Sequence, residues 1–290
     1  MIKGIITKSD SGNFLVLADS KIYFCRGRGV FRKDNIKLLV GDYVKFNEKE
    51  GYIMELLPRK NFLIRPPIAN VDQAIVVMSA KEPELSLNLL DKILVTVTFK
   101  NIDVVVIINK IDLLNEKERK NLESLANYYE NIGYKTTLVS TKTKENINLL
   151  NNLFKDKITV LAGQSGVGKS SILNALDKNF KLKTSPISKT LGRGRHTTRH
   201  VELINIQGGL VADTPGFSKL DFNELELEDL RNSFPEFFDN ASECKYRSCN
   251  HIEEDGCNIK KLLEEGRILS SRYENYLKFA EEIKQRKPRY

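Results

Sequence analysis

The sequence predicts a three-part protein: an antiparallel β-barrel, an α/β domain around a parallel sheet, and a C-terminal helical segment with a cysteine and histidine cluster. Residues 1–65 contain five short strand-like runs separated by turn formers, as in small barrels. The next stretch of about 150 residues alternates Val/Ile runs with helix-like stretches, typical of a parallel sheet covered on both faces. Three of the four cysteines lie within fourteen residues of the polar C-terminal part. We expect domains at residues 1–65, 66–223 and 224–290.

The N-terminal part matches an OB-fold. Its expected strands are residues 2–7, 13–18, 21–26, 42–47 and 51–57. Thirteen basic and seven acidic residues give residues 1–65 a net charge of +6, which favours a polyanionic partner, although solvated charged faces would have the same composition. Cys25 is expected to be a buried small hydrophobe. The first candidates for RNA contact are Arg26, Arg28, Arg32 and Lys33.

The composition indicates a globular protein without membrane segments. The 290 residues carry a net charge of +8 with 41% hydrophobic and 29% charged residues, so the chain can bury a core. Its longest apolar runs, residues 74–78 and 104–108, are far shorter than the roughly 18 residues that span a bilayer. The N-terminus lacks a signal-peptide core, and we expect a cytoplasmic protein with no membrane partner.

The central part is expected to contain several buried strands. They fall at residues 74–78, 104–109, 136–140, 158–163 and 210–212. Helices are expected at Glu116–Asn131 and at residues 144–154. Pro58 and Pro66-Pro67 mark the boundary with the barrel.

A glycine-rich loop follows the strand at residues 158–162 and opens a helix. It reads Gly163-Gln164-Ser165-Gly166-Val167-Gly168-Lys169-Ser170, then Ser171, and fits GxxxxGK[ST]. Backbone N–H groups of such a loop surround phosphate oxygens, and the helix N-terminus favours their charge. Lys169 would reach the β- and γ-phosphates, and the Ser170 hydroxyl would bind Mg²⁺. A glycine-rich turn without a ligand is the alternative, but the strand–loop–helix context favours a nucleotide site.

Two further motifs favour GTP over ATP. Asn109-Lys110-Ile111-Asp112 ends a buried strand, where α/β sheets bind ligands. The Asp112 carboxylate can accept from guanine N1–H and the 2-amino group, but it repels the unprotonated N1 of adenine. Asn109 would orient the loop and reach the guanine edge, and the Lys110 stem would lie along the base plane. Ser140-Thr141-Lys142 fits the loop whose backbone N–H groups approach guanine O6.

The last nucleotide motif is Asp213-Thr214-Pro215-Gly216, which fits DxxG. Asp213 would hold Mg²⁺, often through water, and the Gly216 N–H would sense the γ-phosphate. The basic segment at residues 192–200 precedes it, and simple disorder is one reading of this segment. Alternatively, Thr197 or Thr198 closes on Mg²⁺ and the γ-phosphate as a switch, and the sequence does not choose between the two threonines.

These motifs occur in a circularly permuted order. In Ras-like GTPases the phosphate loop comes first and the base motifs last, whereas here the base motifs come first. The chain resembles the ribosome small-subunit-dependent GTPase A (RsgA) family of circularly permuted bacterial GTPases. The resemblance covers nearly the whole length. It rests on the cysteine spacing and on residues 109–112, 163–171, 192–198 and 213–216, with the tract from Arg59-Lys60-Asn61 to Asn70-Val71-Asp72-Gln73.

The residue after DxxG predicts slow intrinsic hydrolysis. Ras-like enzymes carry a water-orienting glutamine there, whereas this chain has Phe217, which cannot hydrogen-bond water. Our hypothesis is that His196 orients the attacking water once a partner orders the basic segment. The alternative is that the histidines of this segment contact only RNA or solvent. The expected catalytic residues are His196, Lys169, Thr197 and Thr198.

The C-terminal cluster predicts one structural Zn²⁺. Cys244, Cys249, His251 and Cys257 supply three thiolates and one imidazole, a complete tetrahedral set that leaves no position for catalytic water. Reduced cysteines in a small core are the alternative. The resemblance implies the same four ligands. We expect zinc to hold together a segment too short and polar to form its own core, and the mobile segment after Gly216 to reposition this module with the nucleotide state.

The resemblance implies a GTPase checkpoint in late maturation of the small ribosomal subunit, stimulated by that subunit and released after hydrolysis. The expected partners are the small subunit with its rRNA and GTP or GDP, and we expect a monomer. One alternative is a P-loop enzyme of another pathway, such as a nucleotide kinase. Another is an RNA-binding scaffold whose nucleotide site serves only regulation.

Overall fold

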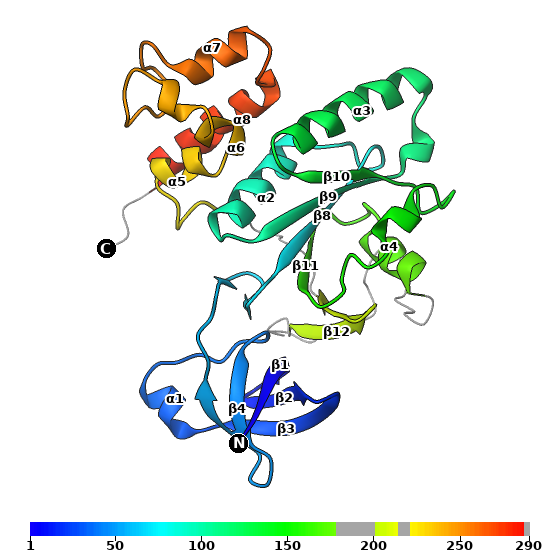
Figure 1. The fold of residues 1–290 in the computed structure, drawn as a ribbon, viewed down its shortest axis with the longest axis vertical. Helices are drawn as coiled ribbons and strands as arrows, with labels where there is room; N and C mark the ends of the chain where they lie inside the picture. Colours follow the sequence, from blue (N-terminus) through cyan, green and yellow to red (C-terminus); the bar gives the residue numbers. More distant parts are fainter. Residues whose placement is uncertain (178–200, 214–220, 287–290) are drawn as a thin grey trace.

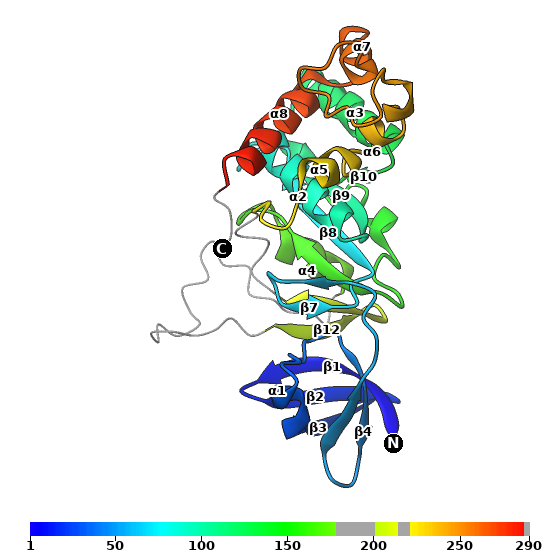
Figure 2. The ribbon, with the colours of Figure 1, turned by 90° about the vertical axis from the view of Figure 1, so that its left-hand side faces the viewer.

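The computed structural model describes residues 1–177, 201–213 and 221–286. Three parts follow one another along the long axis of the molecule, with the barrel at one end and the C-terminal helices at the other (Figures 1 and 2). No helix in the described ranges is long and apolar enough to cross a membrane. The order of the parts in space is their order in the chain.

Five strands close the N-terminal barrel, and the short helix α1 (Gly29–Lys33) lies between the third and fourth. They pair in the order β1-β2-β3-β5-β4, and β4 returns to the first half of β1, which closes the barrel. Only β3 and β5 run parallel. The barrel predicted from the sequence is confirmed, and Cys25 is fully buried. The strands are β1 (Ile2–Asp10), β2 (Asn13–Ala18), β3 (Lys21–Gly27), β4 (Tyr43–Asn47) and β5 (Tyr52–Leu56).

The central sheet is parallel except for one strand. Its order is β10-β9-β8-β11-β13-β12, and only β12 runs antiparallel to its neighbour β13. A short hairpin, β6 (Phe62–Leu63) with β7 (Ile68–Ala69), precedes the sheet. The sheet strands are β8 (Gln73–Ser79), β9 (Asp103–Asn109), β10 (Lys135–Leu138), β11 (Ile158–Ala162), β12 (Glu202–Ile206) and β13 (Gly209–Asp213).

Helices cover both faces of this sheet because its strands are apolar on both sides. On β8, Val76 and Met78 face a core shared with α2 (Leu87–Phe99) and α3 (Glu116–Asn131). The alternate residues Ile75 and Val77 face a second core shared with α4 (Lys169–Leu176). The helix α3 begins and ends where the sequence predicts.

The prediction of a helix at residues 144–154 is wrong. Only a 3₁₀ turn, η2 (Ile147–Leu150), forms there. Lys144, Asn146 and Asn152 have φ of 65°, 59° and 61°, a left-handed conformation that interrupts an α-helix. Asparagine adopts this conformation more readily than most residues, so its repetition here outweighs the helix-like apolar spacing.

A polar tract fixes the point where the chain leaves the barrel. Arg59 donates to both oxygens of the fully buried Asp42 carboxylate, at 2.6 and 2.8 Å. Further along, Asn70 Nδ2 donates to Gly41 O in the barrel at 2.9 Å. These contacts come from the Arg59-to-Gln73 tract that the family resemblance singled out.

The barrel also joins the central sheet edge to edge. β1 pairs antiparallel with β12 through Lys8 and Glu202, whose side chains form a salt bridge at 2.8 Å. The two parts thereby form one continuous 11-stranded sheet. β12 begins two residues after the basic segment at residues 192–200, so the barrel pairs with the strand that follows this segment in the sequence.

The C-terminal part contains an apolar core of its own, so the expectation that it is too polar to form one is wrong. Phe234, Phe237 and Tyr276 are fully buried in this core, and Val95 of α2 packs into it. Aromatic residues spaced along polar helices supply the core, which is why overall polarity misled the prediction. The helices are α5 (Leu227–Asn232), α6 (Pro235–Phe238), η3 (Ala241–Glu243), α7 (Asn258–Glu264) and α8 (Ser270–Lys284).

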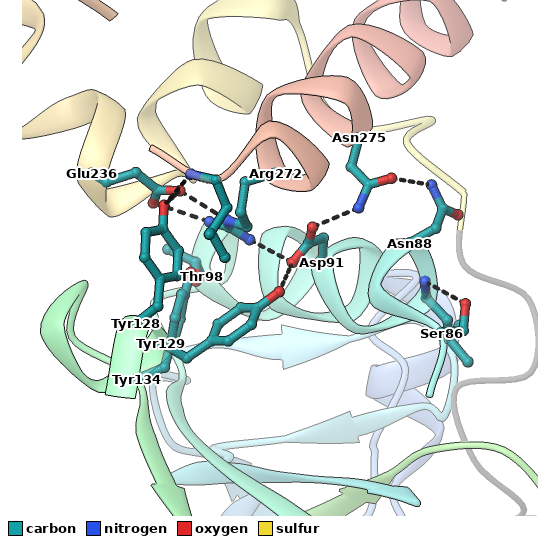
Figure 3. Close-up of polar contacts among 12 residues, drawn as sticks. Ser86, Asn88, Asp91, Thr98, Tyr128, Tyr129, Tyr134, Glu236, Arg272 and Asn275 are labelled. Atoms are coloured by element: carbon teal, nitrogen blue, oxygen red, sulfur yellow. Dashed lines mark hydrogen bonds and ion pairs between the residues drawn. The ribbon is translucent and has the colours of Figure 1, made fainter. Parts of the chain in front are cut away.

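A buried charge network holds this part against α2 and α3 (Figure 3). The guanidinium of Arg272, on α8, is fully buried and donates to Asp91 at 2.7 Å and to Glu236 at 2.8 and 3.0 Å. Tyr129 and Asn275 each donate to Asp91 at 2.7 Å. Burial alone would lower the pKa of Arg272, but the two carboxylates raise it above its ordinary value. Buried ion pairs and hydrogen bonds therefore join the C-terminal part to the central part.

Replacing Arg272 by methionine should strongly destabilise the protein. Arg272→Met leaves two buried carboxylates without their cation, a change that costs about 3–5 kcal/mol. Lys45→Met is the control, because its salt bridge with Glu55 is exposed and is worth less than about 1 kcal/mol. Urea unfolding of both variants measures the difference. Equal free energies of unfolding would contradict this account.

Candidate functional site

The glycine-rich loop lies at the carboxyl end of β11, where the neighbouring strands also end. Only glycine fits at Gly163, because its φ is +130° and a Cβ there would lie 2.0 Å from the carbonyl oxygen of Val77. At Gly168, φ is +99° and a Cβ would lie 2.2 Å from Asn109 Nδ2. The loop is thus packed against β8 on one side and the end of β9 on the other.

The Lys169 side chain folds back over the loop. Its Nζ donates to the carbonyl oxygens of Gly163 at 2.8 Å and of Gln164 at 2.6 Å. Burial lowers the pKa of Lys169. A phosphate group beside this ammonium would supply the negative charge that favours its protonated form. Ser170 and Ser171 follow it in the first turn of α4.

Asn109 ties the base motifs to the phosphate loop. Its side chain is buried, and its Nδ2 donates to Val167 O at 3.0 Å. Its Oδ1 accepts from the Thr141 N–H at 3.1 Å. One amide thereby connects the phosphate loop with both base motifs, so these three segments form a single site in the folded chain.

Asp112 is held by the loop that contains Ser140 and Lys142. Its Oδ1 accepts from Ser140 Oγ at 2.5 Å, and its Oδ2 lies 3.9 Å from Lys142 Nζ. The one-turn helix η1 (Ile111–Leu113) places the carboxylate, with Ile111 buried beneath it. A carboxylate held in place and only partly covered can accept hydrogen bonds from a base.

The turn at Glu82, between β8 and α2, also borders the site, although no sequence motif predicts it. Lys110 Nζ donates to Glu82 O, and the Ser79 hydroxyl donates to Pro83 O at 2.5 Å. A Cβ built on Gly166 would lie 3.8 Å from Pro83 Cδ, so this turn faces both the base motif and the phosphate loop. No nucleotide motif includes these residues, and only the fold brings them there.

Several predicted site residues fall outside the described part of the chain. These are His196, Thr197, Thr198 and Gly216. Asp213 is the last residue of β13, which runs parallel to β11 and ends at the same edge of the sheet as the phosphate loop.

The four predicted metal ligands come together. The ligand atoms of Cys244, Cys249, His251 and Cys257 all lie within 4.8 Å of one another. His251 Nδ1 lies 3.6 Å from Cys244 Sγ and 3.4 Å from Cys257 Sγ. Ligands of one tetrahedral zinc, with Zn–S about 2.3 Å and Zn–N about 2.0 Å, lie about 3.5 Å apart, so this donor set fits zinc.

Burial sets the protonation states of these ligands. Burial, followed by the charge of Arg231, lowers the pKa of His251 to about 4, so its imidazole is neutral and free to ligate at neutral pH. Burial raises the pKa of Cys249 to about 12 and raises that of Cys257. These sulfurs remain protonated unless a cation stabilises their thiolates.

The four candidates for RNA contact all lie on the barrel surface. Arg26 is exposed on β3, Arg28 precedes α1, and Arg32 and Lys33 lie in the last turn of α1.

Comparison with known proteins identifies the family. Residues 56–223 match the model of the RsgA GTPase, and residues 3–53 match that of the RsgA N-terminal domain. The chain belongs to the RsgA GTPase family. The fold class and the GTPase activity predicted from the sequence are thereby confirmed.

Relatives from this family match the chain over its full length. A protein from Geobacillus sp. (strain WCH70) and one from Bacillus anthracis, both named small ribosomal subunit biogenesis GTPase RsgA, are 53% and 52% identical, with all of each chain covered. The crystal structure of YloQ, a circularly permuted GTPase, has 45% identity and a TM-score of 0.84, covering 100% of this chain and 97% of that one. YjeQ from Thermotoga maritima has 37% identity and a TM-score of 0.86, covering 99% of both chains.

Replacing Gly168 by alanine should weaken GTP binding at least about tenfold. The new methyl group collides with Asn109 Nδ2 at a backbone angle that disfavours alanine, and it displaces the amide that connects the three loops. Gly29→Ala is the matched control, since a Cβ there meets nothing within 4 Å. Fluorescent GTP titration compares the two variants. Wild-type affinity in Gly168→Ala would contradict the proposed packing.

Removing one sulfur ligand should release the metal and loosen the C-terminal part. We expect Cys249→Ser to lose bound zinc and to exchange amide hydrogens faster in residues 234–259, with GTP affinity within about twofold of wild type. Cys25→Ala removes a cysteine outside the cluster and should keep its zinc. Elemental analysis and hydrogen exchange by mass spectrometry measure both. Equal zinc content in the two variants would disprove this assignment.

Proposed function

We propose that this RsgA GTPase binds the small ribosomal subunit late in its maturation, hydrolyses GTP there and is released afterwards. The observation that carries the proposal is the convergence of the phosphate loop and both base motifs on the amide of Asn109. The names of the full-length relatives supply the ribosomal context. Such a protein would act in the cytoplasm as a monomer.

In the proposed nucleotide complex, each motif has one role. The backbone of residues 163–168 surrounds the phosphates, and Lys169 leaves its two carbonyl partners to bind the β- and γ-phosphates. Asp112 accepts from the guanine edge, with Ser140 orienting its carboxylate. Mg²⁺, held by Ser170 and Asp213, would neutralise phosphate charge.

Ras-like GTPases orient the attacking water with a glutamine side chain. Phe217 replaces the usual glutamine, so we propose that His196 orients this water when the ribosomal subunit orders the basic segment. Thr197 or Thr198 would close on the γ-phosphate. Hydrolysis by the free protein is slow under this proposal, and the subunit acts as the activator.

The barrel and the C-terminal part would bind ribosomal RNA. The exposed cations Arg26, Arg28, Arg32 and Lys33 suit phosphate contacts on the barrel. One structural Zn²⁺ at the four ligands would fix the surface of the C-terminal part. We propose functional domains at residues 1–65, 66–223 and 224–290, which divide these roles.

GTP turnover at matched enzyme concentration, alone and with small or large ribosomal subunits, tests the proposal. We expect strong stimulation by the small subunit only. Lys169→Ala should abolish turnover in every case, because it removes the phosphate-binding ammonium. Equal, slow turnover under all three conditions would overturn the checkpoint and favour a scaffold with a regulatory nucleotide site. Transfer of phosphate to an acceptor other than water would indicate a kinase.

His196→Ala isolates the catalytic hypothesis. We expect it to lose the stimulated rate and to retain binding to the small subunit. Full stimulated turnover in this variant would refute the role of His196 while leaving the proposed function intact.

A further inference from the structure

The loop between the first two sulfur ligands presents an aromatic ring to solvent between two cations. Residues 245–248 are all exposed, while Cys249 at the end of the loop is buried. Tyr246 has 46% of its surface exposed, although the other aromatic residues of this part mostly lie in its core. Its neighbours in sequence are Lys245 and Arg247. The ring and its two neighbouring cations are therefore outside the core of this part and accessible to a partner.

The loop is held in one conformation by contacts at both ends. The Lys245 N–H donates to Gly256 O at 3.0 Å, and the Cys249 N–H donates to Tyr246 O at 3.2 Å, which closes a turn. Arg231 Nη1 donates to Cys249 O at 3.2 Å. A metal at the four ligands would add two further anchors. A partner that binds this loop therefore loses little conformational entropy in ordering it.

Both cations of the loop are available to a partner. Within the described ranges, neither Lys245 nor Arg247 lies within salt-bridge distance of a carboxylate. Lys245 Nζ lies 5.2 Å from the centre of the Tyr246 ring, a cation–π contact. If a nucleotide base stacked on this ring, the Lys245 ammonium would lie close enough to contact the phosphate of that nucleotide. Arg247 offers a second phosphate contact on the other side of the tyrosine in sequence.

We propose that the Lys245-Tyr246-Arg247 loop binds an unpaired nucleotide of RNA, with the ring stacking on the base and the two cations contacting phosphates. This inference rests on the proposed function, because it supplies a contact through which the C-terminal part holds ribosomal RNA. It adds a second RNA-binding point, separated from the barrel by the whole central sheet (Figure 1).

Acidic residues near Tyr246 allow an RNA partner to be distinguished from a basic protein partner. Tyr246 also lines a pocket of about 420 Å³ with three carboxylates, Glu253, Glu254 and Asp255, and with Lys284. These carboxylates would repel RNA phosphates but attract the cations of a basic protein. Removing one of their charges therefore changes the affinity for the two kinds of partner in opposite directions.

Binding of the zinc-loaded full chain to small ribosomal subunits, and to small-subunit rRNA stripped of protein, tests the proposal. We expect Tyr246→Ala to weaken both interactions about tenfold, and Tyr246→Phe to stay within about twofold of wild type because the phenyl ring still stacks. Phe238→Ala removes another exposed aromatic ring of the same part, 61% exposed, and should bind normally. Zinc content and thermal unfolding confirm that each variant is folded.

Charge variants distinguish the partner. The slope of the logarithm of the rRNA binding constant against the logarithm of the salt concentration should become shallower by about one in Lys245→Gln and in Arg247→Gln. Lys278 is exposed on α8, and Lys278→Gln should leave this slope unchanged. Glu253→Gln and Asp255→Asn should tighten binding about twofold. Weaker binding in these two variants would overturn the RNA assignment in favour of a basic protein.

Failure of this inference can be told apart from failure of the proposed function. Unchanged rRNA and subunit binding by Tyr246→Ala, or an equal loss in Tyr246→Phe, overturns the stacking loop while the wild-type chain still binds subunits. If the wild-type chain does not bind subunits, the proposed function fails. In that case binding to free rRNA still tests the role of the loop, because Tyr246→Ala must then bind the rRNA more weakly than wild type does.

Discussion

The arrangement of the parts depends on buried carboxylates that are matched by arginine. Asp91 of the central part is fully buried and is paired with Arg272 of the C-terminal part, and the fully buried Asp42 is paired with Arg59, where the chain leaves the barrel. A buried ion pair adds little net stability over an apolar contact, but a mispaired one is costly. Such pairs therefore discriminate against wrong orientations more than they strengthen the right one. The consequence is a molecule whose two ends keep a defined relation to its nucleotide site.

The nucleotide site follows from the order of strands in space and not from their order in the chain. Parallel neighbours end at the same edge of the sheet, so loops after β9, β10 and β11 meet wherever their strands occur in the sequence. Asn109 then fixes their mutual positions through one amide. A circular permutation changes only which strands are connected by the backbone. The positions of the loops at the edge of the sheet stay the same, so the nucleotide site is preserved.

The sequence predicted those features whose causes are local. The glycine-rich motif and the apolar strands are local patterns, and the predicted helix Glu116–Asn131 begins at a local capping box of Asn115 and Glu118 in the structure. Prediction failed at residues 144–154, where left-handed asparagines outweighed an apolar periodicity. It also missed Asp91 and Arg272, which are 181 residues apart and carry no motif, and the turn at Glu82, which only the fold brings to the site. Contacts between residues far apart in the sequence, and single residues with positive φ, leave no periodic pattern in the sequence.

The pairing of β1 with β12 has a consequence for the central part on its own. A strand at the end of a sheet offers unpaired N–H and C=O groups to any other chain, and proteins usually cover or interrupt such an edge. Here the barrel covers it at Lys8 and Glu202. The N-terminal part thereby acts as a cap against edge-to-edge association, and a fragment that begins after residue 65 would carry β12 as an open template for aggregation.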